Sequence, residues 1–393
     1  MKYRKDAKSG KDLSVLGFGC MRFTKKGNKI DQEKAEAEML CAIKRGVNYF
    51  DTAYIYPGSE AALGEFLAKG YRDSVYIATK LPHYIIKSLK DADRIFEEEL
   101  KRLKTDHVDY YLMHMLTDLG SWERLCNIGI KDWIEKRKKN GQIRHIGFSF
   151  HGGTHSFKKI VDAYDWEFCQ IQFNYMDEYS QAGTEGLKYA AHKGLPVVVM
   201  EPLRGGRLVN GLSHEVKQMF ATEKPLRSPA EWAFRWIWNF PEVTTILSGM
   251  NSTDQVLENT RIASEVEPGE LSESELNLLT KVKVEINKTV KVSCTGCGYC
   301  MPCPMGVDIP TCFRTYNVKY TDGWRNALRE YLMCTTFKAT HTNASKCVAC
   351  GKCEQHCPQA IEIRKELKNV KNELEGPLYH MARVGLKFLK LKD

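Results

Sequence analysis

The spacing of the cysteines is the strongest constraint on what this 393-residue chain folds into, since ten of its 14 cysteines lie between Cys294 and Cys357. The later run, residues 347–358, reads CVACGKCEQHCP, which is the bacterial ferredoxin spacing for a [4Fe–4S] cluster. The earlier run, residues 294–304, reads CTGCGYCMPCP and is one residue shorter before its last cysteine. A zinc ribbon is the alternative. It needs only four cysteines, whereas eight occur here in two quartets that each end in Cys-Pro.

The two runs are expected to share their ligands. In two-cluster ferredoxins, the fourth cysteine of each run binds the other cluster. The spacing therefore predicts two [4Fe–4S] clusters, each with its own set of four cysteines. The first set is Cys294, Cys297, Cys300 and Cys357, and the second is Cys347, Cys350, Cys353 and Cys303. Cys312 and Cys334 lie outside both runs, and we expect them to be ordinary buried residues.

The charge of the chain is concentrated in the same region. From Lys288 to the end there are 17 Lys and Arg against 9 Asp and Glu, whereas the preceding part is almost neutral. Two clusters pass electrons singly, and a basic face attracts acidic proteins. An acidic ferredoxin or flavodoxin is therefore the protein partner that fits, and a lysine-rich solvated surface is the equally simple alternative.

The distribution of apolar residues indicates a cytoplasmic protein. The longest apolar runs, such as residues 195–200, fall far short of the roughly 18 residues of a membrane span. No apolar stretch follows the charged N-terminal segment, so no secretory signal is expected. Cysteine-rich metal chemistry also suits a reducing compartment. We expect a small-molecule substrate, no nucleic acid and no membrane span.

The first 285 residues alternate between strand-like and helix-like segments. Helical spacing of apolar residues follows most of the β-rich runs, as in residues 92–103 and 156–163. The β-rich runs are residues 14–19, 47–51, 75–80, 108–114, 143–149, 168–173, 197–201 and 243–249. Eight such units predict an α/β fold of the (β/α)8 TIM-barrel type. An open doubly wound sheet is the alternative, but it usually carries a third glycine after its first strand, and LGFGCMRF has only two.

These patterns divide the chain into three parts. Residues 1–285 are expected to form the barrel, closed by a helix over residues 272–287. Residues 286–366 are expected to form a small, mostly helical ferredoxin-like dicluster domain. Residues 367–393 form a basic tail whose interleaved apolar residues predict a helix packed on the protein, with a membrane-surface helix as the alternative.

Four polar residues gather where catalytic groups of a TIM barrel lie, at the carboxyl ends of strands. Asp51, Lys80 and His114 end three of the predicted strands, and Tyr56 follows five residues after Asp51. A tyrosine beside a lysine can donate a proton, and we expect the positive charge of Lys80 to lower the pKa of Tyr56. A neighbouring histidine would orient a substrate carbonyl.

These residues and their surroundings resemble the aldo-keto reductase family, in particular members with a C-terminal ferredoxin-like extension. The matching segments are GFGCMR, GVNYFDTAYIYPGSE, YIATKLP, DYYLMH, HIGFSF, CQIQFNY, VVMEPLRGG and ILSGMNSTDQVLEN, followed by the cysteine region over about 290–365. The resemblance implies an oxidoreductase with a catalytic tetrad of Asp51, Tyr56, Lys80 and His114, in which Tyr56 is the general acid. It also implies a nicotinamide nucleotide, NADPH or NADH, lying extended across the barrel.

The resemblance also implies which residues surround that nucleotide. Ser149 and Gln170 would hold the nicotinamide amide, with Gly19, Met21 and Met200 nearby. The residues implied around the pyrophosphate and the adenosine are Leu203, Gly205, Gly206, Gly249, Asn251, Gln255, Glu258 and Asn259. Three positions depart from the family pattern: Phe150 replaces the usual asparagine, Met200 replaces the aromatic that stacks on the nicotinamide, and Gln255 stands where a basic residue usually clamps the 2′-phosphate.

Three functions are consistent with this sequence. The first is an iron–sulfur oxidoreductase that reduces a carbonyl or related small molecule while the clusters relay electrons. Since hydride transfer moves two electrons and a cluster moves one, a flavin is a candidate adapter. The second is a conventional NAD(P)H-dependent reductase with a structural or oxygen-sensing iron–sulfur tail. The third is a non-enzymatic redox sensor or regulatory subunit, against which the complete tetrad argues.

Overall fold

The computed structural model describes residues 1–288, 291–294, 296, 298, 300–338, 340–357 and 361–391, with side chains up to residue 384. Eight parallel strands form a closed barrel in the order β10-β11-β12-β3-β6-β7-β8-β9. They are β3 (Leu16–Gly19), β6 (Tyr49–Asp51), β7 (Tyr76–Pro82), β8 (Val108–Leu116), β9 (Ile143–Phe150), β10 (Phe168–Gln172), β11 (Val197–Met200) and β12 (Val243–Ser248). The predicted (β/α)8 barrel is therefore confirmed, and the open doubly wound sheet is excluded.

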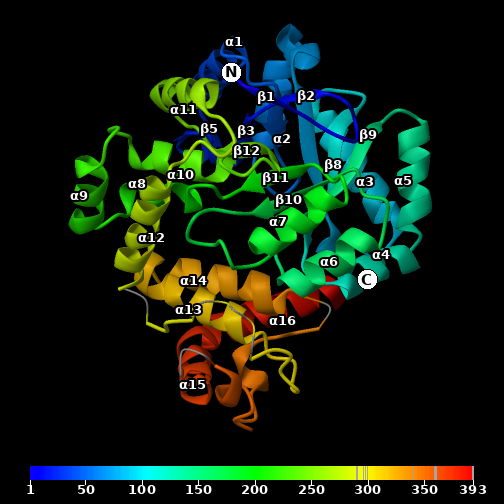
Figure 1. Ribbon diagram of the computed structural model, residues 1–393. Coiled ribbons are helices and arrows are strands. Elements are labelled where there is room, and N and C mark those ends of the chain that lie inside the picture. Colours follow the sequence, from blue (N-terminus) through cyan, green and yellow to red (C-terminus); the bar gives the residue numbers. More distant parts are fainter. Residues whose placement is uncertain are drawn as a thin grey trace.

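Helices surround the strands as the sequence pattern predicted (Figure 1). They are α1 (Gln32–Lys44), α2 (Ser59–Phe66), α3 (Leu89–Leu103), α4 (Leu119–Asn127), α5 (Ile130–Lys139), α6 (Thr154–Asp162), α7 (Gly183–His192), α8 (Arg207–Asn210), α9 (His214–Thr222), α10 (Pro229–Trp238), α11 (Thr253–Glu265) and α12 (Glu273–Asn287). Local sequence sets several of their starts. Ser88 and Ser272 each form a capping box with the acidic residue three positions later, and Ser228 caps α10 just before a proline.

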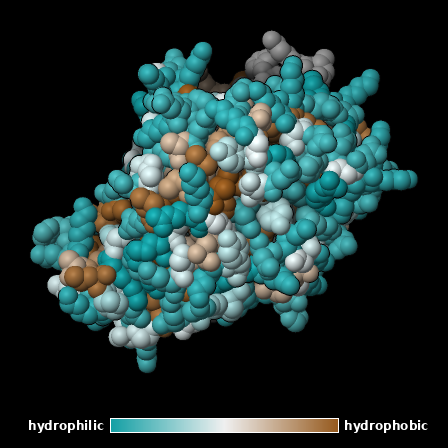
Figure 2. Space-filling view, turned by 90° about the horizontal axis from the view of Figure 1, so that it is seen from above, coloured by the Kyte–Doolittle hydropathy of each residue, from teal (hydrophilic) through white to brown (hydrophobic). Residues whose placement is uncertain are grey.

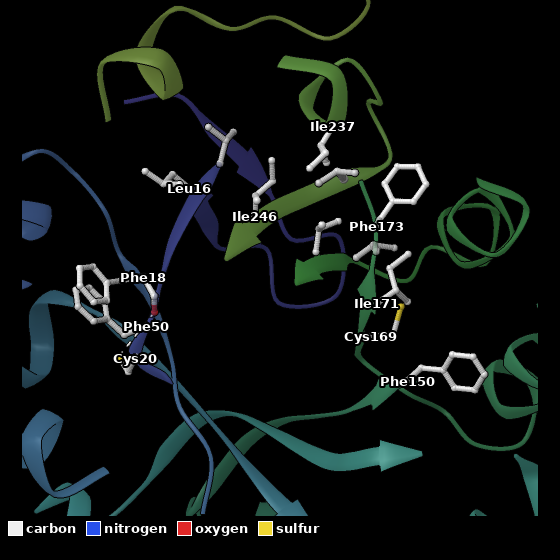
Figure 3. Packing of buried hydrophobic residues seen from close by; sticks show 14 of the residues in the cluster. Leu16, Phe18, Cys20, Phe50, Phe150, Cys169, Ile171, Phe173, Ile237 and Ile246 are labelled. Carbon is white, nitrogen blue, oxygen red and sulfur yellow. Dashed lines mark hydrogen bonds between the residues drawn. The ribbon is translucent and has the colours of Figure 1, made fainter. Parts of the chain in front are cut away.

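The barrel core has two layers, because successive strand residues face opposite sides. Leu16, Phe18 and Ile246 pack in the large cluster between the strands and the helices (Figure 3). Tyr49 and Phe168 belong to a second, smaller buried cluster, which also holds Tyr110 and Leu247. A hairpin of β1 (Tyr3–Lys5) and β2 (Asp12–Ser14) adds Leu13 to this inner cluster. A short hairpin of β4 (Lys25–Lys26) and β5 (Lys29–Ile30) follows β3.

The C-terminal region has a core of its own. It contains α13 (Ile309–Asp322), α14 (Trp324–Tyr331), α15 (Ile363–Leu374) and α16 (Pro377–Leu391). Phe313 and Tyr316 of α13 are buried with Tyr331, Leu367 and Tyr379 from the other three helices. The beginning of α16 therefore packs into the same core as the cysteine region.

This helical region covers the carboxyl ends of the barrel strands. In Figure 1, α13 and α14 lie across one end of the barrel. Arg207, which follows β11, forms an ion pair with Asp322 at the end of α13. Gly296 of the cysteine region lies so close to the loop after β10 that an added Cβ atom would lie 3.0 Å from the carbonyl oxygen of Tyr179. Because the catalytic end of a TIM barrel is the end where the strands terminate, the C-terminal region forms a roof over that end.

The surface seen from above is largely hydrophilic, and hydrophobic residues gather mainly near its middle (Figure 2). This view looks at the molecule from the side of α1 and the N-terminus, away from α13 and α14. Among the helices of the described residues, none is both long and apolar enough to cross a membrane.

Candidate active site and cluster-binding cavity

A buried ion pair lies at the carboxyl ends of β6 and β7. Lys80 Nζ lies 2.5 Å from Asp51 Oδ1 and donates a second hydrogen bond of 2.6 Å to the carbonyl oxygen of Thr52. Lys80 is 0% exposed and Asp51 is 3% exposed. Burial raises the pKa of Asp51 above its usual value, while the attraction of Lys80 opposes that rise. The pair is therefore held almost entirely away from water.

Tyr56 lies beside this pair, in the loop between β6 and α2. Lys80 Nζ is 5.3 Å from the centre of the Tyr56 ring. The ring meets the imidazole of His114 edge-on, with ring centres 6.0 Å apart. The structure thus brings together all four residues of the predicted tetrad, although they come from three different strands and one loop.

The pKa of Tyr56 differs in direction from the sequence-based expectation. Burial, followed by the carboxylates of Asp51 and Glu201, raises the pKa of Tyr56 above its usual value. The expected lowering by Lys80 is therefore wrong for the protein without ligands. The physical reason is the burial of the phenol, to which the negative charges of Asp51 and Glu201 add.

His114 is buried at the end of β8 and is held in its neutral form. Burial, followed by the positive charge of Lys80, lowers the pKa of His114 well below its usual value. Its Nδ1 atom is buried and has no hydrogen-bond partner among the described residues. Met115, the next residue, has a left-handed φ of 63°, and its N–H donates to Ser149 Oγ at 2.8 Å. Backbone strain of this kind is concentrated at functional sites.

The two residues expected to hold the nicotinamide amide are both buried. Ser149 is engaged with Met115 as described, whereas Gln170 Oε1 is buried without a hydrogen-bond partner among the described residues. The Gln170 amide nitrogen contacts only Met200 Sδ, at 3.5 Å. A buried carbonyl oxygen without a donor is costly, and the N–H of a carboxamide would satisfy it. Gln170 therefore fits the expected nicotinamide.

The residues expected around the rest of the nucleotide lie at the same end of the barrel. Gly205 and Gly206 have left-handed φ values of 69° and 91° in the loop after β11. Three of these residues form hydrogen bonds within the protein. The Asn251 N–H donates to Gln255 Oε1 at 2.9 Å. Ser228 Oγ donates to Glu258 Oε1 at 2.6 Å, and Asn259 Nδ2 donates to Ser248 Oγ at 3.2 Å. Gly19 ends β3, Met21 is 45% exposed beside it, and Leu203 is half-buried before Gly205.

Arg22 lies between the two loops expected to carry the nucleotide and was not singled out from the sequence. A Cβ atom on Gly205 would lie 2.7 Å from a guanidinium nitrogen of Arg22, and one on Gly249 would lie 3.0 Å from Arg22 Cδ. Arg22 is exposed, and within the described residues it has no ion pair. Its place directly after the first barrel strand was the signal that could have identified it.

The roof brings further charges to the barrel mouth. Arg314 Nη1 of α13 lies 2.8 Å from Glu330 Oε2 of α14. Burial, followed by the charge of Arg314, lowers the pKa of His151 to about 4. Although burial opposes it, the charges of Arg204 and Arg314 hold the pKa of Asp177 below its usual value. No sequence motif marks these roof residues, since they are far from the barrel loops in the chain.

The second cysteine set lines one cavity. Cys303, Cys347, Cys350 and Cys353 all face a cavity of about 380 Å³ in the C-terminal region. These are the four cysteines that the exchange of fourth ligands assigns to one cluster. Cys300 of the first set is the fifth cysteine that lines it, and thiols around one void fit an inorganic cluster that takes one thiolate at each iron. The unusual spacing before Cys303 thus still brings this residue to the same cavity.

The first cysteine set is described only in part, because Cys297 lies outside the described residues. Cys294, Cys300 and Cys357 are half-buried against the core of the C-terminal region. Cys300 also lines the cavity of the second set, so the two sets adjoin. Within the described part of the chain, no three His, Cys, Asp or Glu side chains are placed to hold a single metal ion.

Cys312 and Cys334 are buried, as predicted for cysteines outside the two runs. Cys312 is 0% exposed and Cys334 is 3% exposed. The Cys334 thiol accepts a hydrogen bond from Arg314 at 3.4 Å.

Two family models match consecutive parts of this chain. A family model described as "Aldo/keto reductase family" matches residues 15–283, and one described as "4Fe-4S dicluster domain" matches residues 293–361. The chain is 31% identical to an uncharacterized oxidoreductase, YrpG, of Bacillus subtilis, over 53% of this chain and 68% of that protein. It is 26% identical to the L-galactose dehydrogenase of Arabidopsis thaliana, over 66% of this chain and 87% of that protein.

Two solved structures have a similar fold. An aldo-keto reductase from Bacillus halodurans has a TM-score of 0.59 at 26% identity, covering 72% of this chain and 96% of that one. An aldo-keto reductase from Klebsiella pneumoniae in complex with NADPH has a TM-score of 0.59 at 22% identity, covering 72% of this chain and 95% of that one.

Proposed function

The chain belongs to the aldo/keto reductase family, and from this we propose that its barrel reduces a carbonyl group of a small molecule with Tyr56 as the proton donor. It is an oxidoreductase with a 4Fe-4S dicluster domain. The observation that carries the proposal is the buried Asp51–Lys80 pair beside Tyr56, with His114 edge-on to the tyrosine ring. A non-enzymatic sensor does not account for this arrangement.

Tyr56 holds its proton until the substrate needs it. Because the pKa of Tyr56 lies above its usual value, the phenol is protonated at neutral pH and donates from its hydroxyl to a carbonyl oxygen. As negative charge develops on that oxygen and on the phenol, the ammonium of Lys80, 5.3 Å from the ring centre, stabilises it. Asp51 and the Thr52 carbonyl fix the ammonium in place.

His114 acts as a neutral hydrogen-bonding group. Its lowered pKa keeps the imidazole uncharged, so it does not compete with Lys80 as a second cation. The nitrogen Nδ1, which lacks a partner among the described residues, is available to position a polar group of the substrate. Its burial excludes water from that side of the site.

The surrounding residues would hold the cofactors. Gln170 would accept a hydrogen bond from the carboxamide of a nicotinamide nucleotide, either NADPH or NADH, and Arg22 with Gly205 and Gly206 would contact its pyrophosphate. Cys303, Cys347, Cys350 and Cys353 would hold one [4Fe–4S] cluster, and Cys294, Cys297, Cys300 and Cys357 the other. When bound, the nucleotide supplies hydride chemistry and the clusters supply one-electron chemistry.

We also propose that the clusters relay electrons to the barrel from an acidic ferredoxin or flavodoxin. The contact between the C-terminal region and the barrel loops supports this proposal, because Gly296 of the first cysteine run lies against the loop after β10 and Asp322 of α13 pairs with Arg207. A bound flavin is a candidate adapter between one-electron and two-electron steps. The clustered cysteines fit a reducing compartment such as the cytoplasm. A conventional reductase with a structural or oxygen-sensing cluster domain is the alternative.

The experiment compares two tyrosines that lie two residues apart. Full-length protein is purified without oxygen and assayed with NADPH and NADH on a panel of aldehydes and ketones. Tyr56→Phe is expected to lower kcat by about 10²–10⁴-fold, the usual contribution of a general acid. Tyr54→Phe is the control, since the Tyr54 hydroxyl is bonded to Glu98 on α3 at 3.0 Å. Wild-type turnover by Tyr56→Phe would refute the proton-donor role.

The exchange of electrons between a bound nucleotide and the clusters is tested by spectroscopy on the same preparation. Visible and electron-spin-resonance spectra are recorded before and after NADH and then NADPH are added. Signals of reduced clusters are expected if nucleotide and clusters share an electron path. Clusters that remain oxidised with both nucleotides, but are reduced by dithionite, would refute a path through the nucleotide.

A further inference from the structure

One face of the C-terminal region is apolar at its centre and surrounds the cavity of the second cysteine set. Met301, Met305 and Val348 line this cavity and are 37%, 41% and 59% exposed. Cys350 also lines it and is the exposed member of the described cysteines. We call the surface formed by Met301, Met305, Val348, Cys350 and Lys352 the outer cluster face. Exposed apolar groups gathered around a functional cavity mark a binding surface.

The first cysteine run contacts the barrel, and the second cysteine set lies farther from it. Gly296, which lies between two cysteines of the first run, is so close to the barrel loop that an added Cβ atom would lie 3.0 Å from the carbonyl oxygen of Tyr179. Cys300 of that run also lines the cavity of the second set. Leu367 of α15 lines the same cavity, and α15 lies on the far side of α13 from the barrel (Figure 1), so the second set lies farther out than the first run.

The rim of the outer cluster face is basic. Lys352 lines the cavity and is exposed, and no ion pair of Lys352 occurs within the described residues. Lys346 Nζ lies beside Gly306, 3.2 Å from where a Cβ atom of that glycine would stand. Arg364 also lines the cavity, but its charge is matched by Glu354 at 2.8 Å. An apolar centre with a basic rim, in which Lys352 has no ion pair among the described residues, is suited to a transient interface with an acidic protein.

We infer that the outer cluster face docks a small acidic ferredoxin. This inference rests on the proposed relay and adds the surface at which the carrier binds. A ferredoxin exchanges single electrons, as the clusters of this chain would. Contact at this face would bring the carrier to the outer cysteine set, the one farther from the barrel.

The test measures binding rather than turnover. The cluster-loaded full-length protein is titrated calorimetrically with an oxidised acidic [2Fe–2S] ferredoxin at low and high salt, and flavodoxin is titrated in a second arm. Lys352→Glu is expected to weaken ferredoxin binding about tenfold, which corresponds to about 1.4 kcal/mol. Wild-type affinity should also fall as salt rises. The matched control is Lys217→Glu, which reverses the charge of an exposed lysine on α9 of the barrel and should bind like wild type.

Three outcomes would overturn the inference. The first is no ferredoxin binding at low salt, and the second is an equal loss of ferredoxin affinity in Lys352→Glu and Lys217→Glu. The third is a dimer of this chain, formed through the outer cluster face and detected by light scattering, in place of ferredoxin binding. Preference for flavodoxin over ferredoxin would overturn the choice of carrier. Iron content and the visible spectrum verify that Lys352→Glu retains its clusters, and Lys352→Gln serves if it does not. NADPH-linked carbonyl reduction is measured separately, so its failure would affect the proposed function and leave the binding result intact.

Discussion

Lys80 and Asp51 form a contact of 2.5 Å between Nζ and Oδ1 at a depth where neither side chain meets bulk water. Removing two charges from water is costly, and only their mutual attraction and the Thr52 carbonyl offset that cost here. Tyr56 is half-buried beside the pair, so the charges of the pair act directly on the proposed proton donor. This arrangement predicts how variants of the pair should behave.

Lys80→Met should destabilise the barrel more than the double variant does. The single change leaves the Asp51 carboxylate buried without a counter-ion, and breaking a buried pair in this way costs about 3–5 kcal/mol. Asp51→Leu combined with Lys80→Met removes both charges and should recover part of that loss. The free energy of unfolding is measured in urea by tryptophan fluorescence, as a double-mutant cycle. Additive effects of the two changes would contradict the coupling, and all three variants should lose carbonyl reduction.

Glu38 provides a pH-dependent prediction on stability. It lies on α1, is 0% exposed, and neither carboxylate oxygen has a hydrogen-bond partner among the described residues. Burial raises the pKa of Glu38 to about 7. Below the unfolded pKa of roughly 4.3 both states are protonated, so no stability is lost. As pH rises from there towards 7, only the unfolded state releases its proton, and the folded state loses up to about 3 kcal/mol.

Glu38→Met should therefore gain stability relative to wild type as pH increases. We expect the difference in unfolding free energy between the two proteins to grow by about 3 kcal/mol from pH 4 to pH 8. Glu33→Met is the control, because Glu33 is exposed on the same helix. A difference between Glu38→Met and wild type that is independent of pH would contradict a buried, protonated Glu38.

Arg22 is predicted to bind the nucleotide rather than to take part in proton transfer. Its guanidinium lies against Gly205 and its stem against Gly249, and a charge-assisted hydrogen bond to phosphate contributes about 1.5–3 kcal/mol. Arg22→Ala should thus raise the Kd for NADPH or NADH by about 10- to 100-fold with little change in kcat. Lys25→Ala, in the adjacent exposed hairpin, is the control. Quenching of protein fluorescence measures the Kd, and equal weakening by both variants would indicate only a general charge effect.

The strands were predictable from the sequence because buried parallel strands appear as short apolar runs separated by helical spacing. The exact ends of the strands were less predictable. Ser14 looked like the start of the first barrel strand, but it pairs with Tyr3 in the antiparallel hairpin, and the barrel strand begins at Leu16. Pairing of this kind depends on residues elsewhere in the chain, which a local pattern does not contain.

The proximity of Asp51, Lys80 and His114, and the grouping of the second cysteine set around one cavity, were predictable because strand ends and ligand spacing are local features. The position of the C-terminal region over the barrel was not predictable. Arg314 reaches the barrel mouth only because α13 packs on loops that lie more than a hundred residues earlier in the chain. The prediction of a lowered pKa for Tyr56 was wrong for a related reason. Proximity to Lys80 was foreseeable, but the burial of the phenol and the nearness of Glu201 depend on how distant parts of the chain pack together.

Cys303 allows the exchange of fourth ligands between the two runs to be tested. It lines the cavity together with Cys347, Cys350 and Cys353, although it belongs to the earlier run in the sequence. Cys303→Ser should therefore lose the outer cluster, and iron content should fall to about half that of wild type, since each cluster depends on its own four thiolates. Cys312→Ser is the matched control: Cys312 belongs to the same region but is 0% exposed and outside both sets. It should retain full iron content, with at most a modest loss of stability. If Cys303→Ser kept all its iron while Cys312→Ser lost half, the fourth ligand of this cluster would be Cys312, and the shortened spacing before Cys303 would be the reason.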